Sequence, residues 1–567
     1  MSSSTERGGM GGGLVPGSYP SPEAMRPTLV GESWSVVAGH PQTAQVAAKI
    51  FEAGGNAVDA GVAAGIASNV VQVDMANFGG IAPILVRPAN SAVAYSVAGI
   101  GRWSRSASLS QLLERYGGKL PLEGAPAIVP GAPAGWIRAL SEFGSMSFAE
   151  VAQPAIDLAK QGFIVDRRLA ESLEITGRRY TKWETSAAIY QPQGRPLVEG
   201  DRLQQVALGE LLEKLVAAEM ARGGSRIDGL QAAHLAFYSG EIARCIADTV
   251  TDRGGYMTVE DLAEFEAEVS TAPQIRFGAW QMFATPSWSQ GPVALEILGL
   301  FERSGRTLHD LVESISLAFN DREDFFSSPD CMERDIAEFL SDDYLSALAS
   351  SITDNAVAGR GAGVGSENGS NLGSTTSVVT MDASGCTFAT SPSDTLDGGP
   401  IIQELGIICS PRGVQTRLDE SHPNRMRPWG RPMVTPAALI GVNGSDSWAL
   451  ACPGGDVIVQ AIAQVAINMN AGLSPQEAVE APRIAAFNAP SAFYPHPTAD
   501  RLVYAEGRIA EADIQKLASQ GHNVELWPDF EFDAGSVQTI VSGTNLQGER
   551  FLLSGADPRR SAYAQSR

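Results

Sequence analysis

The sequence predicts an α/β fold, because β-branched strand segments and alanine-rich helical segments follow one another along the chain. Residues 34–38 predict a strand, residues 43–53 predict a helix, and a second, Ala- and Gly-rich helix follows through residue 67. Residues 81–87 and 92–97 then predict a pair of strands. With 567 residues, the chain is long enough for two or three ordinary domains or for one large layered fold.

The first segment, residues 1–32, is rich in Gly, Pro and Ser and predicts a disordered or extended N-terminus. It lacks the apolar stretch of a signal peptide, and no run of about 18–20 apolar residues predicts a membrane span. We therefore expect a cytoplasmic, soluble protein. The net charge of −23 argues against nucleic acid or an anionic membrane surface as a partner, although local arginines could hold small acidic substrates.

Missing motifs argue against several common classes of enzyme. The sequence has no GxxxxGK[ST] phosphate loop, no HExxH zinc motif and no GxSxG nucleophile turn. Its five cysteines are scattered, without a CxxC pair, and indicate reduced thiols rather than a disulfide framework or a zinc site. We expect neither a metal nor an organic cofactor.

The segment 354–374 consists largely of Gly, Ser, Asn and other small or polar residues and predicts a mobile loop. Residues 375–381 then predict a strand and residues 386–390 the returning strand of a hairpin. On this pattern alone, the segment is a linker that enters a hairpin. The alternative is that the chain cuts its own bond between Ser374 and Thr375.

Such a cut would make Thr375 a new N-terminus. A threonine hydroxyl is a weak nucleophile at neutral pH, but the freed α-amine, with an ordinary pKa of about 7.7–8.0, can accept its proton. This chemistry needs no histidine, and the sequence has only six scattered His residues. The hypothesis depends on support from other segments of the chain.

That support comes from a resemblance that extends over most of the chain. Residues 38–80, which contain HP, a helix, GGNAVDAGVA and a closing GG, resemble the opening of the γ-glutamyltranspeptidase family. Later segments resemble that family in the same order, namely residues 129–135, 148–163, 254–262 and 555–559. The resemblance implies a four-layer αββα fold of the N-terminal-nucleophile hydrolase type.

The family's nucleophile motif, TTH followed by a strand, Asp and Gly, is similar to residues 375–385, with Thr375 and Thr376 on its two threonines. The resemblance implies cleavage between Ser374 and Thr375. This cleavage would divide the chain into a large segment, residues 33–374, and a small segment, residues 375–567, which together form one catalytic fold. The products would be self-derived heavy and light chains, with a dimer of such heterodimers as a further expectation.

A Gly pair is the candidate for stabilising the oxyanion of a tetrahedral intermediate. Residues 452–456, CPGGD, lie between a predicted strand and a predicted helix, where two glycines expose adjacent N–H groups at a positive helix end. A tight turn that simply needs Gly is the alternative. The segment resembles the family's PGG motif, which implies that Gly454 and Gly455 are the donors, with Asp456 beside them as a substrate-binding candidate.

Two hydroxyls beyond the hairpin are assigned by ungapped count. Ser393 falls where the family has a second threonine bonded to the nucleophile, so the resemblance implies a catalytic role. Thr395 falls where the family has a substrate-side Asn, and Thr376 is a further substrate-binding candidate. Both Ser393 and Thr395 could instead be ordinary turn residues.

The sequence differs from the family's motifs at positions that bind the substrate in the family. The family holds the α-carboxylate of a γ-glutamyl group with an Arg, but here Ile100 takes that position and Arg102 lies two residues on. The family's ammonium-binding acids are replaced by a segment with Arg412, whose charge would repel an ammonium. A solvated loop cation is the alternative interpretation of Arg412.

The family's serine pair is also missing, and Thr435 is the only hydroxyl left in that segment. The order of motifs between residues 412 and 436 resembles the family's divergent amidase and acylase branch. Within it, Arg425, Arg427 and Arg431 either bind an acyl carboxylate or pair with surface acids, and we favour the second interpretation.

These observations predict hydrolysis of a small acyl amide, γ-glutamyl-like or otherwise carboxyacyl, through an acyl-enzyme on Thr375. One alternative is a true γ-glutamyltransferase or glutathione hydrolase in which Arg102 binds the carboxylate. The other is an uncleaved, inactive binding scaffold, favoured by the lost Arg, Asp and Ser signatures and opposed by the retained threonines and Gly pair.

Overall fold

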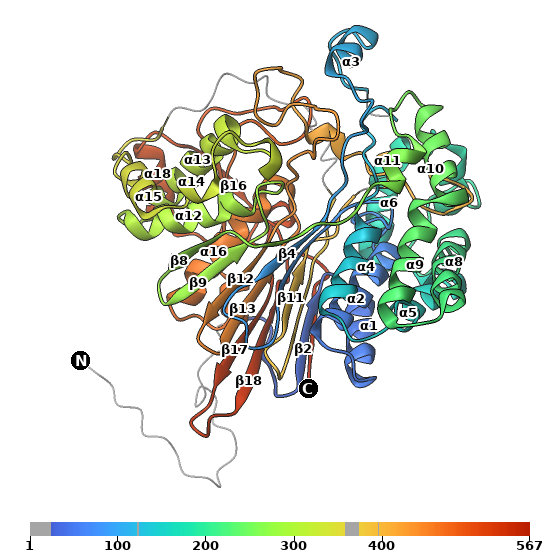
Figure 1. Cartoon of the computed structure of the whole chain (residues 1–567). Coiled ribbons are helices and arrows are strands. Elements are labelled where there is room, and N and C mark those ends of the chain that lie inside the picture. Colours follow the sequence, from blue (N-terminus) through green and yellow to red (C-terminus); the bar gives the residue numbers. More distant parts are fainter. Residues whose placement is uncertain (1–23, 122–123, 358–373, 395) are drawn as a thin grey trace.

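The computed structural model describes residues 24–121, 124–357, 374–394 and 396–567 (Figure 1). Most of the predicted N-terminal segment, most of the predicted loop 354–374, and Thr395 therefore lie outside the described residues. Among the residues that are described, no helix is long and apolar enough to cross a membrane.

Two antiparallel sheets lie face to face at the centre of the molecule, and helices cover their outer faces (Figure 1). In the described chain each sheet has seven strands. The first runs in the order β1 (Leu29–Gly31), β18 (Arg550–Ala556), β17 (Gln538–Thr544), β13 (Asp446–Ala451), β12 (Ala438–Asn443), β9 (Trp280–Ala284), β8 (Gln274–Phe277). The second runs in the order β19 (Tyr563–Ser566), β2 (Trp34–Ala38), β10 (Val378–Asp382), β11 (Thr387–Thr390), β3 (Ala82–Arg87), β4 (Tyr95–Gly99), β7 (Val269–Thr271).

The strand β10 shows why the sheets carry apolar side chains on both faces. Val379 and Met381 point between the two sheets, where they pack in a core that includes Ile440 of β12. Val378 belongs instead to the core between the second sheet and its helices. Because side chains alternate along a strand and both faces are covered, every apolar position of β10 is buried.

The helices α1 (Pro41–Glu52), α2 (Ala57–Val71) and α4 (Ala132–Phe143) pack on the second sheet. A Cβ at Gly61 of α2 would lie 2.3 Å from the ring of Phe388 on β11. The small residues of α2 therefore let its backbone lie unusually close to the sheet. On the other side, α12 (Gly291–Arg303) and α16 (Ile458–Asn470) cover the first sheet (Figure 1).

The remaining elements surround this sandwich. The helix α3 (Leu109–Arg115) projects at the top of the molecule in Figure 1. Beyond the second sheet lie α5 (Phe148–Gln161), α6 (Arg167–Tyr180), α7 (Glu184–Tyr190), α8 (Val206–Arg222), α9 (Arg226–Tyr238), α10 (Gly240–Thr251), α11 (Val259–Ala263), β5 (Phe163–Ile164) and β6 (Arg202–Leu203). Beyond the first lie α13 (Leu308–Phe325), α14 (Ile336–Phe339), α15 (Asp342–Ala349), α17 (Pro475–Glu480), α18 (Glu511–Ser519), β14 (Ile484–Ala486), β15 (Leu502–Glu506) and β16 (Asn523–Trp527). Single 3-10 turns occur at Pro329–Cys331, Arg412–Gln415, Gly455–Val457 and Phe532–Ala534.

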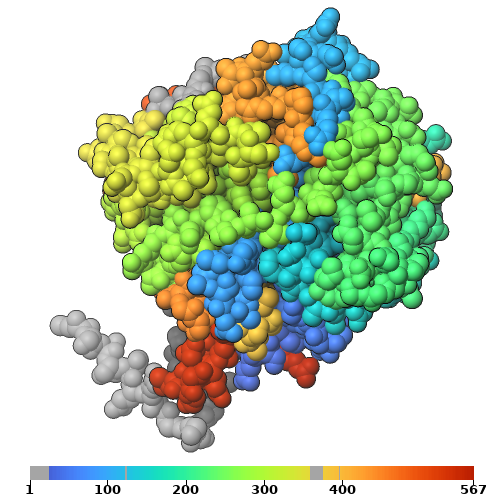
Figure 2. All heavy atoms as spheres, viewed as in Figure 1, coloured from blue at the N-terminus to red at the C-terminus, as the bar shows by residue number. Residues whose placement is uncertain are grey.

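The predicted four-layer αββα fold is therefore confirmed, as are the predicted strand at residues 34–38 and the predicted pair that forms β3 and β4. In Figure 2 the orange segment that follows β11 lies at the top of the molecule, beside the blue segment that follows β4. There the Trp103 N–H donates to the Gly430 carbonyl (2.8 Å). These two segments contain most of the arginines that the sequence singled out.

Candidate active site

The predicted nucleophile lies just before β10, an inner strand of the second sheet. Thr375 forms an isolated antiparallel bridge with Ser393, and β10 itself begins at Val378. The strand was predicted from residue 375, but the chain before residue 378 turns toward Ser393, and the Thr376 N–H donates to the Pro392 carbonyl (3.0 Å). Thr375 is only 1% exposed, so protein groups and not bulk water surround its hydroxyl.

Ser393 is the hydroxyl partner of Thr375. The two Oγ atoms lie 2.7 Å apart, and the Ser393 N–H donates to the Ile81 carbonyl (2.9 Å), which fixes its backbone beside β3. The structure thus brings together the two hydroxyls that the ungapped count paired. The catalytic role of Ser393 stays a prediction.

The carbonyl oxygen of Ser374 belongs to the predicted scissile bond and accepts three hydrogen bonds. Its donors are the Ser393 hydroxyl, Arg412 Nη2 (3.2 Å) and the Asp394 N–H (3.3 Å). Because Ser393 gives its one hydroxyl hydrogen to this carbonyl, its oxygen accepts from Thr375 Oγ1 and from Arg412 Nη2. Hydrogen bonds therefore run from the Thr375 hydroxyl through Ser393 to the Ser374 carbonyl, which they polarise.

Arg412 is the centre of this network. Its side chain is 1% exposed, and its Nε forms an ion pair with the Asp394 carboxylate. Its Nη1 donates to Gln415 Oε1 (3.2 Å), and Gln415 Nε2 donates in turn to Thr435 Oγ1 (3.3 Å). The alternative interpretation of Arg412 as a solvated loop cation is wrong, because the guanidinium is buried and its N–H groups have protein acceptors.

Asp394 forms the ion pair with Arg412 and was not identified from the sequence. Burial raises the pKa of its carboxyl, although the neighbouring guanidinium acts in the opposite direction. Its backbone φ is 127°, a region that L side chains rarely adopt. In this strained conformation the residue directs its N–H to the Ser374 carbonyl and its carboxylate to Arg412. Its position next to Ser393 was the only signal in the sequence.

The Gly454–Gly455 turn lies where the sequence predicted it, between β13 and α16. The two residues have φ values of 140° and 60°, both in the region that favours glycine. Within the described residues, neither N–H has a hydrogen-bond acceptor in the protein. Two free donors before the N-terminus of a helix can stabilise an oxyanion, although this role of Gly454 and Gly455 stays a prediction.

Asp456 anchors this turn to its surroundings. Its Oδ1 accepts from Gln290 Nε2 and from Arg322 Nη1, both at 2.7 Å. Its Oδ2 accepts from the Ala492 N–H (2.9 Å) and from Ser491 Oγ (3.1 Å). Since a carboxylate has about four acceptor positions, a substrate could bind Asp456 only by displacing one of these donors.

One cavity joins the scissile bond to the Gly turn. It has a volume of about 850 Å³ and is lined by Ser374, Gly454 and Asp456. Much of the remaining wall is aromatic and comes from segments far apart in the sequence, namely Phe319, Phe487, Phe493, Tyr494, Tyr504, Trp527 and Phe532. A neighbouring cavity of about 30 Å³ is lined by Thr375, Thr376 and Pro453. The predicted nucleophile and the predicted oxyanion donors therefore share one region of the molecule.

Thr376 supports the site from the other side. Its Oγ1 donates to Gln72 Oε1 (2.7 Å), and Gln72 Nε2 donates to the Gly39 carbonyl (3.2 Å). The hydroxyl is thus bonded to the residue that follows α2, and a direct contact of Thr376 with substrate stays a prediction.

Arg102 lies in a separate ion-pair cluster. Its Nη2 pairs with Glu268 (2.8 Å), and its Nη1 pairs with Asp330 (2.8 Å) and donates to the Trp429 carbonyl (2.8 Å). Arg431 also reaches Glu268 (3.3 Å), so the favoured interpretation of that residue as an acid-paired arginine fits the structure. No contact in the described chain links Arg102 to the hydrogen bonds around Thr375, and its substrate role stays a prediction.

Comparison with known proteins places this geometry in a family. The family model for gamma-glutamyltranspeptidase matches residues 43–566. The glutathione hydrolase-like YwrD proenzyme of Bacillus subtilis is 27% identical over 95% of this chain and 99% of its own length. The acylase ACY 1 proenzyme of Pseudomonas sp. (strain SE83) is 28% identical over 90% of each chain. The oxamate amidohydrolase proenzyme of Klebsiella pneumoniae is 27% identical over 93% of this chain and 97% of its own.

Solved structures agree with this result. The cephalosporin acylase from Bacillus halodurans superposes with a TM-score of 0.83 at 25% identity, over 98% of this chain and 99% of its own. A structure of LmbA2991HD gives a TM-score of 0.87 at 27% identity, over 96% of this chain and all of its own. The sequence match and the shared fold lead to one conclusion: this chain belongs to the γ-glutamyltranspeptidase family.

Proposed function

We propose that this protein is an autoprocessing threonine hydrolase that cleaves small carboxyacyl amides. The observation that carries the proposal is the Ser374 carbonyl, which accepts hydrogen bonds from Ser393, Arg412 and the Asp394 N–H while the Thr375 hydroxyl donates to Ser393. A peptide carbonyl in a plain linker has no need of a buried guanidinium. Three donors on the oxygen beside a candidate nucleophile suit attack on that carbonyl.

Self-cleavage begins when Thr375 Oγ1 attacks the carbonyl carbon of Ser374, and Ser393 Oγ takes up the hydroxyl proton while it passes its own hydrogen on to the Thr375 nitrogen. Negative charge forms on the Ser374 oxygen, where Arg412 Nη2 and the Asp394 N–H already point. The C–N bond then breaks and the Thr375 nitrogen takes up a proton, which leaves an ester between Ser374 and Thr375 Oγ1. Water hydrolyses the ester to a Ser374 carboxylate and a free N-terminal Thr375.

The two products stay in one fold because each sheet contains strands from both sides of the cut. In the second sheet, β10 pairs with β2, and in the first sheet, β12 pairs with β9. We therefore propose a heterodimer of a heavy chain that ends at Ser374 and a light chain that begins at Thr375.

Amide hydrolysis uses the same hydroxyl with a different base and different donors. Thr375 Oγ1 attacks the substrate carbonyl, and the freed α-amine accepts the proton and passes it to the leaving amine. The Gly454 and Gly455 N–H groups stabilise the oxyanion. Water then releases the acyl group from Thr375.

The position of Arg412 favours a substrate whose acyl group carries a carboxylate. Once the Ser374 carbonyl has left, the Nη2 donor that bound it is free to bind an anionic oxygen of the substrate. A group with an ammonium at this place is disfavoured, because the family's ammonium-binding acids are absent and a guanidinium is present. A relative named for oxamate, in which a carboxylate adjoins the amide, supports the same class of substrate.

The experiment that tests the proposal is intact-mass spectrometry of the wild type, Thr375→Ala and Thr375→Ser. We expect two fragments that meet between Ser374 and Thr375 in the wild type, slower cleavage in Thr375→Ser, and one chain of 59.7 kDa in Thr375→Ala. A wild-type chain that stays whole on prolonged incubation would overturn the mechanism and leave the binding scaffold as the function.

The substrate class is tested with the cleaved enzyme on three amides of one aniline: a carboxyacyl, a γ-glutamyl and a neutral acyl group. We expect fastest turnover of the carboxyacyl amide. Turnover of the γ-glutamyl amide alone would point to the glutathione hydrolase alternative.

A further inference from the structure

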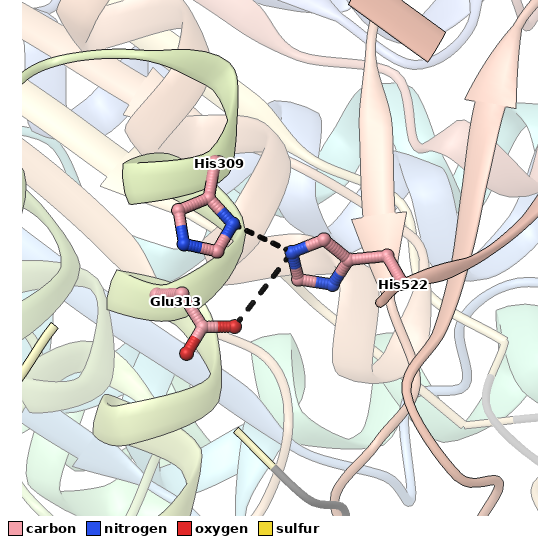
Figure 3. A group of neighbouring side chains, drawn as sticks. All are labelled: His309, Glu313 and His522. Atoms are coloured by element: carbon pink, nitrogen blue, oxygen red, sulfur yellow. Dashed lines mark hydrogen bonds and ion pairs between the residues drawn. The ribbon is translucent and has the colours of Figure 1, made fainter. Parts of the chain in front are cut away.

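Three buried side chains meet on the far side of the first sheet's helical layer, away from Thr375. His309 and Glu313 lie one turn apart on α13, and His522 lies in the loop between α18 and β16 (Figure 3). Each is no more than 5% exposed, and one ligand atom from each lies within 4.8 Å of the others. His309 and His522 are 213 residues apart in sequence, so no local sequence motif predicts this cluster.

The hydrogen bonds of His309 fix which ring nitrogen carries its proton. Nε2 lies 2.7 Å from the Thr353 carbonyl, which only accepts, so Nε2 is the protonated nitrogen. In the neutral ring the lone pair is then on Nδ1, which faces His522 Nε2 at 2.8 Å (Figure 3). A backbone carbonyl that orients a ring in this way is the usual outer partner of a metal-bound histidine.

Glu313 contributes a carboxylate oxygen without a hydrogen-bond donor. Its Oε2 accepts from the Val357 N–H (3.0 Å). Its Oε1 is fully buried, lies 3.8 Å from His522 Nε2, and has no hydrogen-bond partner among the described residues. Burial of an unpaired carboxylate oxygen is costly, and a cation between the carboxylate and the two rings removes that cost.

We propose that His309 Nδ1, His522 Nε2 and Glu313 Oε1 bind one divalent transition-metal ion, with Zn²⁺ as the ion that this ligand set suits best. Two imidazoles and one carboxylate are a common ligand set for zinc, and a fourth position is left for water. The ion displaces the proton that the two imidazoles share in the metal-free chain. All three ligands are buried and none lines the cavity at Ser374, so the role is structural.

The site also links the two sides of the proposed cut, a consequence that rests on the proposed function. His309 and Glu313 precede the Ser374–Thr375 bond, and His522 follows it. The Val357 N–H, at the end of the described segment that leads to the cut, donates to Glu313. A metal ion here would therefore join the heavy chain to the light chain after cleavage.

The test is metal binding by purified protein after treatment with a chelator and removal of the chelator. Zn²⁺ is titrated by calorimetry, and Co²⁺ by its visible absorption, which reports the coordination geometry of the bound ion. We expect one ion per chain in the wild type, binding at least about 100-fold weaker in Glu313→Gln and in His522→Asn, and unchanged binding in the control His40→Asn. His40 is also buried and acid-paired, with Asp166, but lies outside the cluster.

Thermal unfolding serves as a second readout, because an ion that binds the folded state raises the melting temperature. Zn²⁺ should raise the melting temperature of the wild type and of His40→Asn but not that of Glu313→Gln. Equal binding by wild type and Glu313→Gln, or no stoichiometric binding by folded wild type, would overturn the proposal. The same titration on Thr375→Ala is expected to match the wild type, so a failure of self-cleavage and a failure of the metal site are separate results.

Discussion

Two buried arginines, Arg412 and Arg102, show how one residue type takes two different tasks in this molecule. Both were candidates for binding the substrate, and both are nearly inaccessible, at 1% and 7% exposed. The acid that pairs with Arg412 is itself buried, since the Asp394 side chain is 2% exposed. The acids that pair with Arg102 are about half exposed, at 57% for Glu268 and 47% for Asp330.

The difference lies in where the remaining N–H groups point. The Nη groups of Arg102 end on two carboxylates and the Trp429 carbonyl, an arrangement that neutralises charge and ties segments together. Arg412 uses one edge for Asp394 and directs Nη2 at Ser393 and the Ser374 carbonyl. Burial alone therefore does not identify a functional arginine. What distinguishes Arg412 from Arg102 is an N–H directed at the carbonyl of the proposed scissile bond.

The largest effect is expected from Arg412→Met. It removes a charged donor from the Ser374 carbonyl, and loss of one oxyanion donor slows such reactions by about 10²–10³-fold. Self-cleavage should slow by that factor in a time course of intact mass after synthesis. Arg102→Met, the matched substitution, should leave the cleavage rate within about two-fold of the wild type, because Arg102 makes no contact with the scissile bond.

A control separates lost catalysis from lost folding. Arg412→Met leaves the Asp394 carboxylate buried without its partner, which is strongly destabilising. The double variant Arg412→Met/Asp394→Asn removes that unpaired charge and should regain thermal stability without regaining cleavage. If the double variant cleaves at the wild-type rate, Arg412 acts only through the fold.

A smaller effect is expected at Ser393, which relays the hydrogen bond of Thr375. Ser393→Ala removes the acceptor for the Thr375 proton and one donor to the Ser374 carbonyl, and should slow cleavage about 10²-fold. Ser393→Thr keeps a hydroxyl at the same place and should cleave within a few-fold of the wild type. The cleavage time course of both variants checks this. Equal slowing in both would show that packing, and not the hydroxyl, matters at this position.

The sequence was informative where the chemistry is local. The hairpin after Ser374, the Gly454–Gly455 turn and the neighbourhood of Thr375 and Ser393 all lie where short segments predicted them. In each case the signal is a residue type that its backbone or its chemistry requires, such as glycine at positive φ.

The rest depended on contacts between distant segments. The aromatic wall of the cavity combines residues such as Phe319 and Trp527, and no local pattern brings them together. The burial of Arg412 depends on the strained backbone of Asp394, which propensity does not predict. His309 and His522 meet only through tertiary packing. In these places topology, and not residue type, brings the side chains together.

Stability is where Arg102 should matter. Arg102→Met removes hydrogen bonds to two carboxylates and one carbonyl, and bonds to charged groups typically contribute about 1.5–3 kcal/mol. Because both acids are half exposed, water compensates part of the loss, and we expect the free energy of unfolding to fall by about 1–2 kcal/mol. Urea unfolding followed by tryptophan fluorescence measures this. An unchanged midpoint would mean that Glu268 pairs fully with Arg431 alone.

The smallest expected effect is the pH dependence of that loss. Burial raises the pKa of Glu268, but the charges of Arg431 and Arg102 lower it by more than burial raises it. The pKa of Glu268 therefore lies below its ordinary value. Burial likewise raises the pKa of Asp330, but the neighbouring Ser328 hydroxyl and the Arg102 guanidinium lower it, again with a net decrease.

A carboxyl whose pKa is depressed by folding stabilises the protein above its ordinary pKa, and this stabilisation is lost as the pH falls through the folded-state value. The difference in unfolding free energy between wild type and Arg102→Met should therefore be constant near pH 7 and shrink below about pH 4.5. The change should stay under about 1 kcal/mol, because both acids are half exposed. Other titrating groups are common to both proteins and cancel in this difference. A difference that stays constant down to pH 3 would assign the contribution of Arg102 to the Trp429 carbonyl and to packing, and not to its two acids.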